Sequence, residues 1–139
     1  MPALYTPELL SLATELIAYP IDRDFVYCGQ ARSQTCGSSM DLAFDLADGA
    51  MGPAGAQVTA CAIGQASAAL FLRHAIDRRA SELLGMGTQM AKWLKGGDRP
   101  DFPSLALLEG ARNHLGRHGA IMLPWNALRA ALENGHRPR

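Results

Sequence analysis

The residues of this chain best suited to chemistry are its three cysteines, Cys28, Cys36 and Cys61. Their number is odd and no two of them form a Cys-x-x-Cys pair, which argues against a disulfide framework in a reducing compartment. A cysteine thiolate binds zinc and iron, and an exposed one accepts sulfur or exchanges with a disulfide. Cysteine is also a small apolar side chain that is often simply buried. For Cys28, simple burial is the interpretation that its local sequence favours.

The other two cysteines stand where a loop meets regular structure. Cys36 precedes residues 40–47, in which apolar and polar side chains alternate as in a half-buried strand. Cys61 follows a second short strand expected over residues 56–60, and a helical pattern begins directly after it. An antiparallel hairpin places the start of its first strand and the end of its second at the same end of the sheet. We therefore expect Cys36 and Cys61 to lie close together, where two thiolates can share one soft cation or cluster iron.

The elements that must position these cysteines follow from hydrophobic periodicity. A helix is expected from Thr6, a capping residue, to Pro20, and residues 21–39 lack a period and are expected to form an exposed loop that contains Cys28. Residues 48–55 read as turn and loop. Helical patterns then cover residues 62–76, 81–94, 105–115 and 124–132. These features predict an α+β fold, a small antiparallel sheet near the N-terminal half packed against helices, in one domain spanning residues 1–139.

Composition and motifs exclude several classes of function. Thirteen basic and thirteen acidic side chains give a formal net charge of +0, so the basic excess of a nucleic-acid binder is missing. No apolar run approaches the roughly 20 residues that span a bilayer, and the N-terminus lacks the features of a secretory signal. We expect a cytoplasmic protein with neither nucleic acid nor membrane as partner. Without a glycine-rich phosphate loop or a Gly-x-Ser-x-Gly motif, an independent enzyme is not expected, although a sulfur-relay role stays open.

Several segments resemble the IscU/NifU family of iron–sulfur cluster assembly scaffolds. Thr35–Leu42 resembles the segment with that family's first ligand cysteine, and Cys61–Ala68 resembles the segment with its second. Residues 101–132, with the stretches Leu107–Arg112 and Leu123–Leu128, are similar to the C-terminal part of the SufU-like branch. The resemblance implies an IscU/SufU-like fold and an iron–sulfur cluster or zinc bound through Cys36 and Cys61. It also implies a cysteine desulfurase as sulfur donor and recipient apo-proteins as partners.

The chain departs from the family at two ligand positions. The family's third cysteine lies five residues before the tryptophan that is Trp125 here, a position occupied by Ala120. Its ligand aspartate, two residues after the first cysteine, is replaced by Ser38. A methyl group cannot bind a metal, and a neutral hydroxyl is a poor ligand. Cys28, from the expected loop, and His118 are candidate substitute ligands, although burial or a surface position explains each of them more simply.

Three interpretations of the cysteines therefore stay open. In the first, the chain assembles iron–sulfur clusters, with Cys61 as a ligand and Cys36 as a ligand or sulfur acceptor. In the second, it is a degenerate relative that keeps the fold and acts as a binding or regulatory module without metal. In the third, Cys28 or Cys36 forms a reversible disulfide with Cys61. The cofactor is accordingly a cluster, zinc or none.

Overall fold

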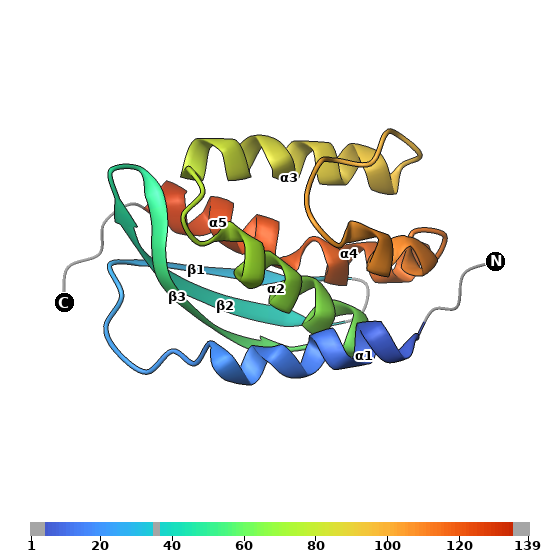
Figure 1. The fold of residues 1–139 in the computed structure, drawn as a ribbon, viewed down its shortest axis with the longest axis horizontal. Coiled ribbons are helices and arrows are strands. Elements are labelled where there is room, and N and C mark those ends of the chain that lie inside the picture. Colours follow the sequence, from blue (N-terminus) through green and yellow to red (C-terminus); the bar gives the residue numbers. More distant parts are fainter. Residues whose placement is uncertain (1–4, 35–36, 135–139) are drawn as a thin grey trace.

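The computed structural model describes residues 5–34 and 37–134 (Figure 1). In chain order its elements are α1 (Pro7–Thr14), the 3-10 helix η1 (Glu15–Ala18), β1 (Tyr27–Arg32), β2 (Ser39–Ala47), β3 (Ala50–Thr59), α2 (Ala62–Ala75), α3 (Ala80–Leu94), the 3-10 helices η2 (Leu105–Ala111) and η3 (Leu115–Arg117), α4 (His118–Ile121) and α5 (Leu123–Asn134). Among the described residues, no helix is both long and apolar enough to cross a membrane.

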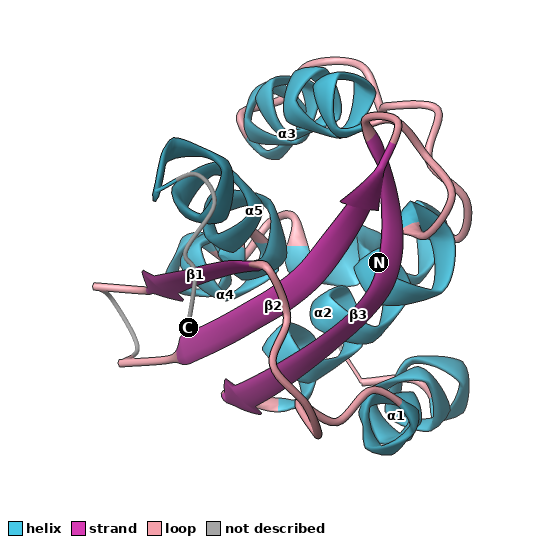
Figure 2. Cartoon of the chain, turned by 90° about the vertical axis from the view of Figure 1, so that its left-hand side faces the viewer, coloured by secondary structure: helices cyan, strands magenta, loops and turns pink. Residues whose placement is uncertain are grey.

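The three strands form one antiparallel sheet in the order β1-β2-β3. Helix α5 packs over β1 and β2, while α2 packs over β3, so both helices cover the same face of the sheet (Figure 2). The apolar side chains of β2 that point to this face, Met40, Leu42 and Phe44, are 0–1% exposed. The predicted α+β fold with a small antiparallel sheet and helices beside it is confirmed.

Strand β1 lies inside residues 21–39, so the prediction of a continuous loop there is wrong, and Cys28 belongs to a strand. The strand escaped prediction because its sequence holds small and polar residues where β-branched ones are usual. Gly29 shows why. A Cβ at this position would lie 2.3 Å from the carbonyl oxygen of Ala127, so β1 and α5 approach each other too closely for a side chain between them. Packing against α5, rather than local propensity, sets the composition of β1.

Two further expectations needed adjustment. β3 begins at Ala50 rather than near residue 56, and it includes Pro53, which lies at the register shift between β2 and β3, a place in an edge strand where proline is tolerated. The helix expected over residues 105–115 is a 3-10 helix that ends at Ala111. Gly110 and Gly116 interrupt the pattern there, and glycine weakens an α-helix.

The face of the sheet opposite the helices is partly covered as well. The segment between η1 and β1 crosses it, visible in Figure 2 as the loop in front of β2. The Ala56 N–H donates to the Tyr19 carbonyl at 2.8 Å, and a Cβ at Gly55 would lie 2.3 Å from the Pro20 carbonyl oxygen. Ala43, at the centre of this outer face, is 2% exposed. The segment therefore shields the middle of the outer face, while Gln30 and Gln57, on the same face toward the start of β2, are exposed.

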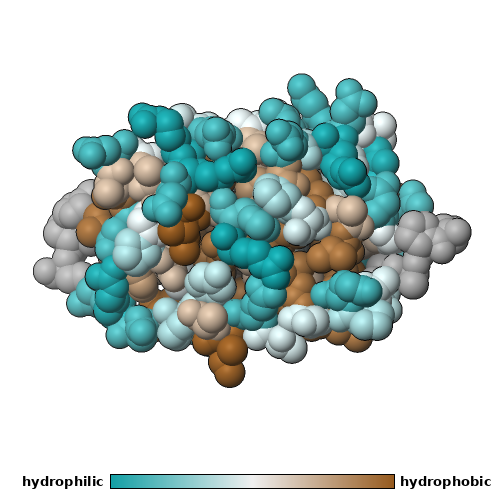
Figure 3. Space-filling model, viewed as in Figure 1, coloured by the Kyte–Doolittle hydropathy of each residue, from teal (hydrophilic) through white to brown (hydrophobic). Residues whose placement is uncertain are grey.

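Among the described residues, the exposed large hydrophobic side chains are Tyr5, Leu10, Ile17, Ile21 and Leu115. Polar groups dominate the visible face, with apolar side chains showing between them in scattered places (Figure 3). The most exposed large apolar residues, Ile17 at 90% and Leu115 at 79%, lie on different elements. Isolated residues of this kind are normal on a globular protein and do not mark a binding surface.

Candidate functional site

The end of the sheet where β2 begins and β3 ends is the place predicted for the cysteines. Ser39, the first residue of β2, lies opposite Thr59, the last residue of β3. If this register continues by one residue, Ser38 lies beside Ala60, and Cys61 follows directly. Cys36 lies outside the described residues, so its closeness to Cys61 stays a prediction.

Cys61 joins the sheet to the longest helix against it, as its sequence setting predicted. It is the N-cap residue of α2, with extended backbone angles, and its side chain makes no capping hydrogen bond. The first turn is held instead by Gln65, whose backbone N–H donates to the Cys61 carbonyl and whose side-chain amide donates to the Ala60 carbonyl, each at 3.0 Å. The thiol is half-buried and forms no disulfide. It is therefore a free thiol at a helix N-terminus.

Ala120 packs directly against the first turn of α2. It is 0% exposed, and its Cβ lies 3.3 Å from the place where a Cβ on Gly64 would stand. The Ser67 hydroxyl, one turn further along, donates to the Ile121 carbonyl at 2.6 Å and ties α4 to α2. The position that the resemblance assigned to a third cysteine is thus close to Cys61 in space, although 59 residues separate them in the chain.

Ser38 completes this end of the sheet. It is 5% exposed, and its carbonyl accepts a hydrogen bond from the Ser33 N–H at 2.8 Å. The Gly37 N–H returns to the Ser33 carbonyl at 3.1 Å, and Gly37 has a φ of 71°, which favours glycine. The side chain at position 38 is consequently an interior one, on the same face of the sheet as Met40.

Comparisons with known proteins agree with this geometry. No family model matches the chain. The iron–sulfur cluster assembly scaffold protein IscU of Thermotoga maritima is 27% identical over 111 residues, which cover 78% of each chain. The N-terminal part of a nitrogen-fixing NifU-like protein from Brucella abortus superposes with a TM-score of 0.86 at 25% identity, covering 94% of this chain and 92% of the other. In sequence and in fold the chain resembles the IscU/NifU-like scaffolds.

A second solved structure matches the fold of this IscU/NifU-like chain. The iron–sulfur cluster assembly scaffold protein for the SUF system from Fervidobacterium islandicum gives a TM-score of 0.83 at 19% identity, with 93% of this chain and 96% of the other covered. Almost the whole described fold is therefore shared.

Cys28, one of the two candidate substitutes in this IscU/NifU-like chain, is far from that end. Its strand partner is Ala43, which in turn pairs with Gly55. Thr59 lies four residues further along β3 and two strands across, about 16 Å from Cys28 at ordinary strand spacings. A disulfide needs Cα atoms within about 7 Å, and ligands of one metal must be similarly close. Cys28 also belongs to the outer face of the sheet, so we leave it out of the site.

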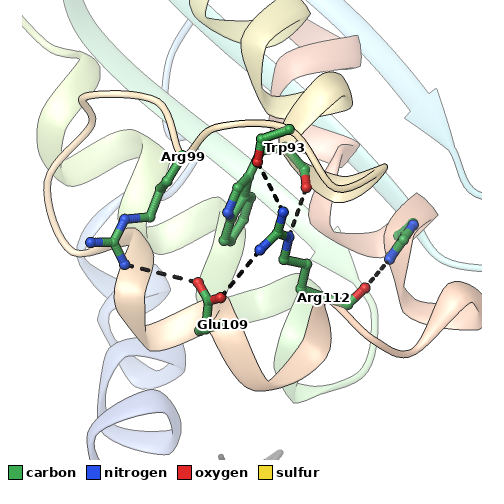
Figure 4. A network of polar contacts seen from close by, with 6 residues as sticks. Trp93, Arg99, Glu109 and Arg112 are labelled. Carbon is green, nitrogen blue, oxygen red and sulfur yellow. Dashed lines mark hydrogen bonds and ion pairs between the residues drawn. The ribbon is translucent and has the colours of Figure 1, made fainter.

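His118, the other candidate substitute, is engaged in a network at the start of α4 (Figure 4). Its Nε2 lies 2.6 Å from the Arg112 carbonyl oxygen, to which the protonated nitrogen donates. In a helix, side chains two residues apart point about 200° apart, so His118 and Ala120 face different ways. The imidazole thus has one nitrogen committed away from the Cys61 end.

Arg112 is the organising residue of this network, and sequence reasoning missed its role. Its guanidinium donates to the Trp93 carbonyl at 2.8 Å and to the Gly97 carbonyl at 2.9 Å, and it pairs with Glu109 at 3.4 Å. It thereby adds a donor to the Trp93 carbonyl, which also accepts from the Gly96 N–H at 3.0 Å, and it bonds the Gly97 carbonyl in the loop after α3. Through its own carbonyl it also holds His118, two residues before Ala120.

The side chains at the Cys61 end do not fit a four-ligand zinc or cluster site. Position 120 carries a buried methyl group and position 38 a neutral hydroxyl, while the His118 ring is bonded elsewhere. In the described part of the chain, no group of three or more histidine, cysteine or carboxylate side chains could hold a metal ion. Among the described residues at the ligand positions that the resemblance implies, Cys61 alone carries a soft ligand for a metal.

The close contact at Gly64 gives a direct test of the packing beside Cys61. Gly64→Ala places a Cβ 2.7 Å from the Cβ of Ala60, closer than such atoms can lie, so the start of α2 must shift. We expect a loss of about 1–3 kcal/mol in the free energy of unfolding, measured by urea denaturation, despite alanine's better helix propensity. Gly85→Ala is the matched control, because nothing lies within 4 Å of its Cβ position in α3. It should stabilise the protein by about 0.5–1 kcal/mol, and equal effects of the two substitutions would contradict the packing.

Proposed function

We propose that this IscU/NifU-like chain acts in iron–sulfur cluster assembly as a sulfur acceptor, with Cys61 as an accepting thiol and Cys36 as its predicted neighbour. The observation that carries the proposal is the Cys61 thiol. It is half-buried, makes no capping bond and stands at the N-terminus of a 14-residue helix. Neither Ala120 nor Ser38 supplies the further anionic ligand that would commit this thiol to a metal.

The proposed chemistry needs only a persulfide donor. The Cys61 thiolate attacks the outer sulfur of a persulfide on the donor, a new S–S bond forms on Cys61, and the S–S bond of the donor breaks. The donor leaves as a thiolate, so sulfur moves without net oxidation or reduction. By analogy with the family, the donor is a cysteine desulfurase and the recipients are proteins that require clusters.

Mass spectrometry of the intact chain tests this proposal. The reduced protein is incubated without oxygen with a cysteine desulfurase and cysteine, and the added sulfur is located by alkylation and peptide mapping. We expect sulfur on Cys61 or Cys36, unchanged uptake in Cys28→Ser, and loss of uptake in the Cys36→Ser Cys61→Ser double variant. Uptake that persists in the double variant, or that follows Cys28, would refute the proposal.

A second candidate is a binding or regulatory module that keeps the fold without sulfur chemistry. It is favoured by the buried methyl of Ala120 at a former ligand position. In that case the double cysteine variant would still bind the desulfurase, measured by calorimetry, while the wild-type chain would take up no sulfur.

A further inference from the structure

We infer that positions 38, 61 and 120 are arranged as in a metal site, an arrangement called the frame below. Two of the three positions carry side chains that are not good ligands, so the wild-type chain does not hold zinc or iron tightly there. Restoring the side chains at positions 38 and 120 would make it bind. The inference goes beyond the proposed sulfur transfer, since it concerns which ligands the fold can bring together.

The first part of the frame is the contact between Ala120 and the start of α2. Ala120 is fully buried, and its Cβ lies 3.3 Å from the Cβ position of Gly64, which in turn lies 2.7 Å from the Ala60 Cβ, so residues 60, 64 and 120 meet closely beside Cys61. The hydrogen bond from Ser67 to the Ile121 carbonyl fixes α4 against α2 at this point. A thiol introduced here would be held near Cys61 by contacts that already exist.

The second part is the register of the sheet. Ser39 opposite Thr59 brings Ser38 beside Ala60, the residue before Cys61 and the closest neighbour of the Gly64 position. Ser38 is 5% exposed, so a carboxylate in its place would enter the interior close to Cys61. A buried carboxylate alone is costly, and coordination to a metal is one of the ways in which it is tolerated. Positions 38, 61 and 120 therefore converge from three segments of the chain.

The wild-type side chains explain why metal binding at the frame is expected to be weak. Zinc in proteins is bound by thiolates, imidazoles and carboxylates, usually four in a structural site. Cys61 supplies one thiolate, and Cys36, outside the described residues, can add at most one more. His118 faces another way from α4 than Ala120, and Cys28 lies at a distant strand position, so neither substitute that the sequence offered is placed beside Cys61.

The test compares metal binding by the wild-type chain, the Ala120→Cys variant and the Ser38→Asp Ala120→Cys variant. Zinc affinity is measured by competition with a chromophoric chelator, and cobalt(II) reports thiolate coordination by its absorption spectrum. We expect weak binding by the wild type, a gain of about 100-fold with Ala120→Cys, and a further gain with the added carboxylate. Ala69→Cys is the matched control, because Ala69 is also a fully buried alanine but lies two turns along α2 from Cys61. It should leave the affinity unchanged.

Two results would overturn the inference. One is stoichiometric zinc in the wild-type chain that is lost in Cys61→Ser. The other is an Ala120→Cys variant that keeps the circular dichroism and thermal stability of the wild type but gains no affinity. The single substitution keeps the test decisive if the double variant folds poorly. Sulfur uptake is a separate readout, so tight zinc in a wild-type chain that also accepts sulfur would refute this inference and leave the proposed function standing.

Discussion

Gly29→Ala is expected to destabilise the protein more than any other substitution considered, by about 3 kcal/mol or more. The added Cβ would lie 2.3 Å from the Ala127 carbonyl oxygen and 2.4 Å from the Ala131 nitrogen. Both are backbone atoms of α5, which cannot turn aside as a flexible side chain can. Helix α5 would have to lift away from β1, and the contact between them would open. Urea unfolding followed by circular dichroism measures the loss, or shows that the variant is not folded at all.

Gly52→Ala is the matched control for this effect. Gly52 also lies in a strand, β3, but its Cβ position is 3.4 Å from the nearest atom, the Asp45 carbonyl oxygen, which is an ordinary contact. Its free energy of unfolding should change by no more than about 0.5 kcal/mol. If Gly29→Ala unfolded at the same urea concentration as this control, the close approach of α5 to β1 would be refuted.

Arg112→Met is expected to cost about 2–3 kcal/mol of stability and to loosen the segment before α4. The substitution keeps the length of the side chain but removes the donors to the Trp93 and Gly97 carbonyls, one of them partly buried. Because the Arg112 carbonyl also holds His118, we expect faster amide hydrogen exchange in residues 113–122. Hydrogen-exchange mass spectrometry gives the local effect and urea unfolding the global one.

Two control variants distinguish the effect of losing this hydrogen-bond network from the effect of losing a positive charge. Arg99→Met removes an arginine that is 51% exposed and lies 3.9 Å from Glu109, a surface pair worth about 0–1 kcal/mol. It should leave exchange in residues 113–122 unchanged. Arg112→Lys keeps the charge but cannot reach both carbonyls with a planar fork, so its stability should fall between those of the wild type and Arg112→Met. An Arg112→Met variant no less stable than Arg99→Met would show that the network contributes nothing.

The parts of the fold that the sequence predicted correctly are those governed by local patterns. Alternation over residues 40–47 and the helical period after Cys61 led to the hairpin, to α2 and to the position of Cys61 between them. β1 was missed because its Gly29 reflects packing against a helix about 100 residues later in the chain, which no local window contains.

The same distinction applies to the candidate site. The position of Ala120 near Cys61 could be expected only through the resemblance to a family, since nothing in its own neighbourhood indicates it. Arg112 gave no signal, because its partners are backbone carbonyls, and any residue type carries those. Cys28 was misplaced for a related reason, since a strand without β-branched residues looks like a loop.

The segment that crosses the outer face of the sheet also limits how large molecules can approach the chain. Helices α2 and α5 cover one face of the sheet and residues 19–26 cross the middle of the other, so a protein partner cannot lie flat across the whole sheet. The exposed residues nearest to Cys61, among them Gly37 and Thr59, lie at the rim where β2 begins and β3 ends. A sulfur donor would therefore reach Cys61 from this rim or from the uncovered part of the outer face beside it, where Gln57 is exposed.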